Sequence, residues 1–178
     1  EYTLPLKLAE LAIKNQSQNS LGSVLDLGCG TGLLGLQLKN VCKNIEGIDL
    51  SKKMIEQARS KKIYDDLKQV DILEYLKSSE LNFDYYFAAD VFIYVGNLSD
   101  LFRLIKTRNK KSGKLIFSTE HSEREGFSLQ QSGRYSHSKS YIVNLCHEFN
   151  FNLTHFSTVD LRKENGKVLM GGIYLLDF

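Results

Sequence analysis

The sequence is poor in several residues that mark particular protein classes. Its 178 residues include no tryptophan, one proline and three cysteines. Cys29, Cys42 and Cys146 lack C-x-x-C spacing and are odd in number, which argues against a disulfide framework or a zinc cluster and is typical of a reduced intracellular protein. No apolar run approaches the roughly 18 residues that span a bilayer, and residues 1–10 do not resemble a signal peptide. We therefore expect a cytoplasmic protein with no membrane partner.

An excess of charge of either sign is also missing. The 23 Lys and Arg residues nearly balance the 21 Asp and Glu residues, so the net charge is +2 and a nucleic-acid partner is not expected. At about 150 residues per domain, the length predicts a single domain over residues 1–178. The chain begins with Glu1 rather than Met, so an N-terminal extension or a repeat region could precede it.

Short apolar runs alternate with helical patterns over the first two-thirds of the chain. The runs predict five strands, at residues 24–27, 45–48, 69–72, 85–89 and 114–119. Apolar residues at helical spacing between them predict helices, one of which begins after Ser51 as its N-cap. This alternation indicates right-handed βαβ crossovers and a mostly parallel sheet.

The last third departs from this rhythm. A helix is expected over residues 139–150, followed by strands at 153–159 and 168–176 with no helix between them. The intervening Asn165-Gly166 is the strongest short signal for a hairpin, so an antiparallel hairpin closes the parallel units. Residues 121–138 form the longest stretch expected to be irregular, and such stretches are usually functional or disordered.

The most informative segment is residues 24–35, which reads as a strand, a glycine turn and a helix. Glycine lets a backbone turn tightly and approach a ligand closely, and a helix N-terminus offers free N–H groups. Asp49 lies 21 residues after Gly28, at the end of the second strand, where a carboxylate can bind both hydroxyls of a ribose. The segment therefore favours a cofactor site, with a glycine turn that binds no ligand as the alternative.

Two positions in this segment distinguish between cofactor classes. A nicotinamide site requires G-x-G-x-x-G, but Leu33 stands at the third glycine position. Asp26, two residues before the first glycine, would repel a pyrophosphate and suits a cationic ligand. A cationic cofactor without phosphate is therefore favoured.

VLDLGCGTG at residues 24–32 and GIDLSKKM at residues 47–54 resemble the first two motifs of class I S-adenosylmethionine-dependent methyltransferases. The resemblance implies an α/β fold with a Rossmann-like, mostly parallel sheet of seven strands. It also implies the order 3-2-1-4-5-7-6, with strand 7 antiparallel and helices on both faces. Residues 88–94, 118–121, 133–138 and 161–162 further resemble small bacterial methyltransferase domains associated with tetratricopeptide repeats.

The resemblance implies S-adenosylmethionine as the cofactor and assigns residues to it. The residues expected to contact it are Asp26, Gly28, Cys29, Gly30, Thr31, Asp49, Leu50, Met54, Asp71, Ile72, Ala89 and Asp90. Gly28 and Gly30 would face its methionine part, Asp26 its ammonium and Asp49 its ribose. Asp71 could instead serve only as a helix cap. We see no metal-ligand spacing and expect no metal.

Acceptor residues are expected after strands four and five, because ligands of open α/β sheets bind beyond the carboxyl ends of the strands. The candidate catalytic residues are His121, Tyr135 and His137, and the candidate substrate-binding residues are Tyr94, Glu120 and Arg134. Histidine titrates near physiological pH and suits a general base. Basic residues near Arg134 suggest an anionic acceptor, with a merely solvated charged loop as the alternative.

We therefore predict methyl transfer to an oxygen or nitrogen of a small, anionic acceptor. A protein acceptor is the alternative, while the low charge disfavours RNA. A non-catalytic cofactor-binding module and an NAD(P)-dependent short-chain oxidoreductase are more remote. Tyr135 and Lys139 match the Y-x-x-x-K spacing of that oxidoreductase class, but its T-G-x-x-x-G-x-G motif is absent.

Overall fold

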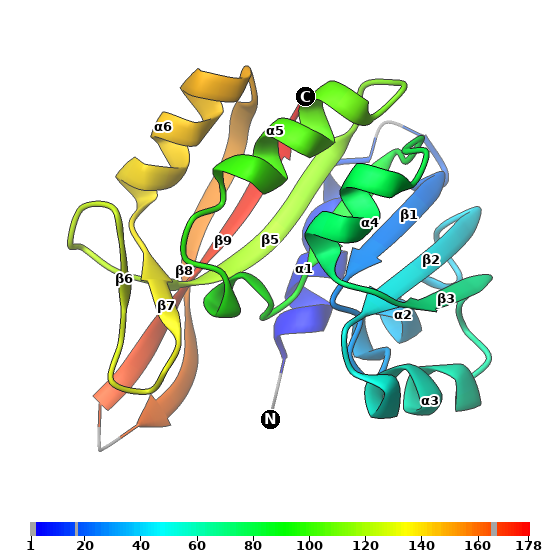
Figure 1. Cartoon of the computed structure of the whole chain (residues 1–178), viewed down its shortest axis with the longest axis horizontal. Coiled ribbons are helices and arrows are strands. Elements are labelled where there is room, and N and C mark those ends of the chain that lie inside the picture. The colour runs from blue at the N-terminus through cyan, green and yellow to red at the C-terminus, as the bar shows by residue number, and fades with distance from the viewer. Residues whose placement is uncertain (1–2, 17, 165–166) are drawn as a thin grey trace.

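The computed structural model describes residues 3–16, 18–164 and 167–178 and centres on a mixed sheet (Figure 1). Its parallel strands lie side by side in the order β3 (Asp66–Gln69), β2 (Asn44–Asp49), β1 (Ser23–Leu27), β4 (Tyr85–Ala88) and β5 (Lys114–His121). β9 (Lys167–Asp177) then pairs antiparallel with β5, and β8 (Asn152–Glu164) pairs with β9. The order 3-2-1-4-5-9-8 confirms the predicted fold, with β8 and β9 as the predicted strands six and seven. The predicted turn at residues 165–166 lies outside the described residues.

Helices cover both faces of this sheet. α4 (Ile72–Ser78), α5 (Ser99–Arg108) and α6 (Lys139–Phe149) lie on the near side in Figure 1, whereas α1 (Leu4–Lys14) and α2 (Leu33–Leu38) lie on the far side. α3 (Lys52–Ser60) contacts β2 and β3. Each face has its own apolar cluster, built around Phe102 and Phe117 on the near side and Leu8 and Leu38 on the far side. Among the described residues, no helix is both long and apolar enough to cross a membrane.

Side-chain caps explain where the helices near the carboxyl edge of the sheet begin. The Ser51 hydroxyl accepts a hydrogen bond from the Met54 amide and confirms the predicted start of α3. The Asp71 carboxylate accepts from the amides of Leu73 and Glu74 and begins α4. The strand predicted at residues 69–72 therefore lies too late in the sequence, because β3 ends at Gln69.

Residues 121–138 are more ordered than their sequence suggests. They contain two short strands, β6 (Phe127–Leu129) and β7 (Tyr135–His137), which pair antiparallel. Glu120 of β5 pairs with β7 and also with β9, so β7 occupies the side of β5 that β4 leaves after Ala88. The prediction of an irregular stretch was wrong because three-residue strands are too short to show a period. The β6–β7 hairpin consequently lies next to the segment that follows β4.

Candidate functional site

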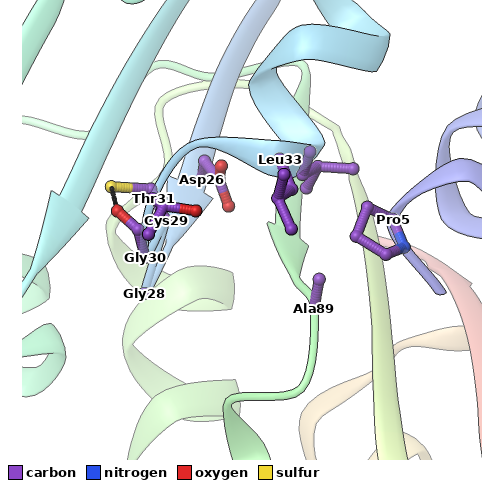
Figure 2. Close-up of a pocket in the computed structure, with 9 residues that line it drawn as sticks. Pro5, Asp26, Gly28, Cys29, Gly30, Thr31, Leu33 and Ala89 are labelled. Atoms are coloured by element: carbon purple, nitrogen blue, oxygen red, sulfur yellow. Dashed lines mark hydrogen bonds between the residues drawn. The ribbon is translucent and has the colours of Figure 1, made fainter. Parts of the chain in front are cut away.

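Two adjoining pockets open where the parallel strands end, and Gly28, Gly30 and Ala89 line both of them. The larger has a volume of about 670 Å³, within the roughly 300–1,000 Å³ typical of ligand pockets. The smaller measures about 130 Å³ and is drawn in Figure 2, with Asp26 beside the glycine turn and Pro5 across the opening. Together they form one candidate site at the predicted edge of the sheet.

Every residue predicted to contact the cofactor lines one of these pockets. The smaller is lined by Pro5, Asp26, Gly28, Cys29, Gly30, Thr31, Leu33, Leu34 and Ala89. The larger is lined by Gly28, Gly30, Asp49, Leu50, Ser51, Met54, Val70, Asp71, Ile72, Ala89, Asp90, Val91, Tyr94 and Val95. Some of the unpredicted members, such as Ser51 and Val91, are sequence neighbours of predicted ones. Pro5 comes from α1, and no motif in the sequence around it indicates a place in the site.

The glycine turn lets the main chain form the floor shared by both pockets. Gly28 and Gly30 have φ values of +67° and +54°, in the left-handed region that favours glycine. A Cβ atom at Gly28 would lie 2.6 Å from a Val91 methyl group, so this position must be small for packing as well. A Cβ atom at Gly30 would meet nothing within 4 Å. Gly30 therefore faces open space at the centre of the site.

Asp49 ties the glycine turn to the end of β2. One carboxylate oxygen, Oδ2, accepts a hydrogen bond of 2.9 Å from the Gly30 amide, and Oδ1 accepts one of 2.8 Å from the Ser51 amide. A carboxylate has about four acceptor positions, so each oxygen keeps capacity for a further donor. Asp49 also lines the larger pocket. Its position fits a ligand that presents hydroxyl groups.

Asp26 contributes a buried carboxylate to the smaller pocket. Its Oδ2 accepts a hydrogen bond of 2.7 Å from the Tyr64 hydroxyl, while its Oδ1 is buried without a hydrogen-bond partner. Burial raises the pKa of Asp26 to about 7, the hydrogen bond from Tyr64 lowers it, and the negative charge of Asp49 adds to the rise. A buried polar atom without a partner is costly. The arrangement therefore fits a ligand with a cationic donor, such as an ammonium group.

Comparison with known proteins shows which family the chain belongs to. The family described as "Methyltransferase domain" matches residues 18–166. The chain belongs to this methyltransferase family. Over 53 residues it is also 42% identical to a protein of Schizosaccharomyces pombe named as an uncharacterized methyltransferase. That match covers 30% of this chain and 20% of the yeast protein, so the chain spans about a fifth of that relative's length.

Solved structures share the fold of this methyltransferase. An S-adenosylmethionine-dependent methyltransferase from Clostridium acetobutylicum matches with a TM-score of 0.73 and 19% identity, over 100% of this chain and 92% of that one. Magnesium protoporphyrin IX methyltransferase from Synechocystis, with bound S-adenosylmethionine, matches with a TM-score of 0.71 and 18% identity, over 97% of this chain and 78% of that one. N-methyltransferase NodS from Bradyrhizobium japonicum, in complex with S-adenosylhomocysteine, matches with a TM-score of 0.73 and 18% identity, over 97% of this chain and 84% of that one. The predicted methyltransferase family and the predicted Rossmann-like fold are confirmed, while the link to tetratricopeptide repeats stays a prediction.

The segment after β4, where acceptor residues were expected, begins with a residue of unusual backbone conformation. Asp90 adopts a φ of +59°, which is uncommon outside glycine, and its amide donates to the Ser118 hydroxyl at 2.9 Å. Such strained residues cluster at functional sites. The 3₁₀ turn η1 (Phe92–Tyr94) follows, and Tyr94 lines the larger pocket with its side chain mostly exposed. Of the predicted substrate-binding residues, Tyr94 is therefore the one beside the pocket.

The remaining predicted acceptor residues line neither pocket of the methyltransferase: Glu120, His121, Arg134, Tyr135 and His137. His121 contacts the exposed Glu123 carboxylate at 3.1 Å, and its ring packs near Phe156. The Tyr135 ring packs over Gly96, and Arg134 is partly buried. Within the described ranges, no group of three or more His, Cys, Asp or Glu side chains is arranged to hold a metal ion.

His137 is buried and holds the segment after η1. Its Nε2 lies 3.0 Å from the Val95 carbonyl oxygen and 2.9 Å from that of Gly96, so the neutral ring donates from Nε2. Burial lowers the pKa of His137, against the opposing effect of these two carbonyl groups. The geometry favours a structural role for His137 over its predicted role as a base.

A pH-dependent effect on stability follows from the burial of His137. Because its folded pKa is lowered, the unfolded chain takes up this proton first as the pH falls. Its contribution to stability is complete above the usual histidine pKa and is lost below it. We expect the free energy of unfolding of the wild type to fall more steeply than that of His137→Gln between about pH 7 and 5, measured by denaturant titration. His147→Gln, at an exposed position of α6, should keep the wild-type slope. Parallel curves for the wild type and His137→Gln would contradict this assignment.

Proposed function

We propose that the protein transfers a methyl group from S-adenosylmethionine to an oxygen or nitrogen atom of a small acceptor. The observation that carries this proposal is the unpartnered, buried Oδ1 of Asp26, in a pocket adjoining the one lined by Asp49. Asp26 would bind the ammonium of the cofactor, and Asp49 its ribose hydroxyls. Gly30 lines both pockets and would let the main chain approach the ligand closely.

The adenine end of the cofactor would lie in the larger pocket. Leu50 and Met54 line it and are 68% and 37% exposed, so they present apolar surface to the pocket. Ile72 lines the same pocket after the Asp71 cap. These apolar side chains suit a flat heteroaromatic ring, and Asp71 lies where it could accept from an exocyclic amine.

The chain itself would contribute positioning and exclusion of water. When bound, S-adenosylmethionine supplies an electrophilic methyl group on its sulfonium. In-line displacement of that group depends mainly on holding the acceptor atom in line and dry. Ala89 lines both pockets, with Asp90 and Tyr94 close by in the larger, so these three residues would flank the acceptor.

The charges around the site favour a neutral or cationic acceptor. The residues that line the two pockets in the described part of the chain include Asp26, Asp49, Asp71 and Asp90 but no Lys, Arg or His. The basic residues behind the expectation of an anionic acceptor line neither pocket; the Lys139 ammonium, for example, lies over the Phe156 ring. An amine or a neutral hydroxyl suits this lining better than a carboxylate or phosphate.

A protein acceptor is the second candidate. Tyr94 is 65% exposed beside the larger pocket, and Phe127 and Leu129 of the β6–β7 hairpin are also exposed. Because Phe127 packs close to Gly96, this hairpin lies next to the acceptor segment. An exposed apolar margin of this kind suits a peptide that extends beyond the pocket.

Transfer of a labelled methyl group to fractions of a cell extract tests the function. With S-adenosylmethionine as donor, we expect label in the small-molecule fraction and none with an Asp49→Ala variant. Label in the protein fraction instead would favour the second candidate. If calorimetry detects S-adenosylhomocysteine binding but no fraction is labelled, the chain is a cofactor-binding module. Binding of NADPH without binding of S-adenosylhomocysteine would refute the proposal.

A further inference from the structure

Tyr64 lies in the turn between α3 and β3, and its ring occupies a space that three glycines leave open. A Cβ atom at Gly35 would lie 2.6 Å from the Tyr64 hydroxyl, one at Gly47 2.8 Å from its ring and one at Gly32 3.0 Å from its ring. These glycines belong to α2, β2 and the glycine turn. The absence of side chains at three separate segments therefore admits one aromatic ring beneath the glycine turn.

The hydroxyl at the end of this ring reaches Asp26. It donates to Oδ2 at 2.7 Å and leaves Oδ1 without a partner in the smaller pocket. Burial and the neighbouring Asp26 charge raise the pKa of Tyr64 far above its usual range, so the hydroxyl keeps its proton and stays a donor. One oxygen of Asp26 is thereby held by the protein, and the other remains for a ligand.

We infer that Tyr64 is a positioning residue that fixes the Asp26 carboxylate for the ammonium group of the bound cofactor. This inference rests on the proposed function. Tyr64 itself lines neither pocket, so it acts through Asp26. Its role is to keep the Asp26 carboxylate ionised and its Oδ1 directed toward the ammonium group of the cofactor.

The groups around Asp26 explain why the hydrogen bond from the neutral Tyr64 hydroxyl matters there. Asp49 contributes negative charge from β2, and burial together with the nearby Asp26 and Asp49 charges raises the pKa of the Cys29 thiol, which stays neutral. The Lys61 ammonium donates to the Thr31 carbonyl oxygen. The Tyr64 hydrogen bond thus opposes the burial that raises the pKa of Asp26 to about 7. Without it, Asp26 would be protonated at a higher pH.

The test compares two probes in the wild type and Tyr64→Phe, which keeps the ring and removes the hydroxyl. S-adenosylhomocysteine carries the ammonium group, whereas 5′-methylthioadenosine lacks the amino-acid end. For Tyr64→Phe at pH 7 we expect about fivefold weaker binding of S-adenosylhomocysteine by calorimetry, because a rise of about one unit in the pKa of Asp26 lowers its ionised fraction from about one half to about one tenth. The pH at which affinity reaches half its maximum should rise by about one unit, so the difference shrinks at alkaline pH. Binding of 5′-methylthioadenosine should not change.

Two further variants separate the hydrogen bond from general packing. Gly35→Ala places a methyl group where the Tyr64 hydroxyl lies, so it should displace the hydroxyl and reproduce the shift in pH profile. Tyr75→Phe removes a similar bond, from a hydroxyl to the Glu46 carboxylate, outside both pockets. It should leave both affinities unchanged.

The outcomes distinguish failure of this inference from failure of the proposed function. If the wild type binds neither probe, both fail. If the wild type binds both probes but Tyr64→Phe and Gly35→Ala keep its pH profile, the inference alone is wrong. An equal loss of affinity for both probes at every pH would also overturn it, because such a loss means a disturbed glycine turn.

Discussion

Replacing Asp49 with alanine is expected to raise the Kd for S-adenosylhomocysteine at least about 100-fold. The substitution would remove two charged hydrogen bonds to ribose hydroxyls, each worth about 1.5–3 kcal/mol, and a total of about 3 kcal/mol corresponds to roughly 100-fold in Kd. It also releases the amides of Gly30 and Ser51, which the carboxylate holds at 2.9 and 2.8 Å. The glycine turn would then lose its anchor on β2. Isothermal titration calorimetry measures the effect directly.

Two comparison variants make this result specific. Asp49→Asn keeps the size of the side chain and one acceptor oxygen, so its Kd should lie between those of the wild type and Asp49→Ala. Asp66→Ala removes a carboxylate on β3 that is half exposed, pairs with Lys68 and lines neither pocket. That variant should bind with wild-type affinity. A Kd for Asp49→Ala within about twofold of the wild type would refute the ribose assignment.

The sheet could be predicted because buried parallel strands read as short continuous apolar runs. β1 and β4 are buried along nearly their whole length and were placed within a residue or two. β3 has the sequence Asp-Leu-Lys-Gln, is mostly exposed at the edge of the sheet and carries no such run. The apolar residues that replaced it in the prediction, Val70 and Ile72, lie around the start of α4 and line the larger pocket.

The cofactor side of the site was predictable for a related reason. Its predicted residues lie near the ends of strands, in the glycine turn or in the first turn of α3, and the topology brings the ends of β1, β2 and β4 together. The role of Tyr64 could not be found in this way. Its place depends on glycines at positions 32, 35 and 47, which come from three different elements, and residues 63–66 contain no motif.

The acceptor side depended on tertiary contacts that no local pattern reveals. His137 was selected for its pKa and its polar surroundings in the sequence, but β7 buries it against carbonyl groups about 40 residues away. Arg134 and Lys139 make the loop basic in sequence, yet neither lines a pocket, and the Lys139 ammonium lies over the Phe156 ring. A count of charges along the chain cannot show which side chains face a pocket. The acidic lining follows instead from the ends of four strands.

Replacing Gly30 with leucine should abolish cofactor binding while leaving the fold largely intact. A Cβ atom at Gly30 meets no protein atom within 4 Å, so the added side chain would extend into the space shared by the two pockets. The positive φ of Gly30 adds a backbone cost of about 1–2 kcal/mol to the free energy of unfolding. We expect Kd to rise more than about 100-fold, since the leucine competes for volume with the ligand rather than weakening one contact.

Gly133→Leu is the matched control for this substitution. Gly133 also has a positive φ, +76°, and open space around its Cβ position, but it lines neither pocket. Both variants should lose a similar amount of stability in denaturant titrations, because both place leucine in the left-handed region. Only Gly30→Leu should lose binding of S-adenosylhomocysteine in calorimetry. Equal affinity in the two variants would mean that the cofactor does not approach the glycine turn. It would also refute the proposal that Asp26 binds the ammonium group and Asp49 the ribose hydroxyls.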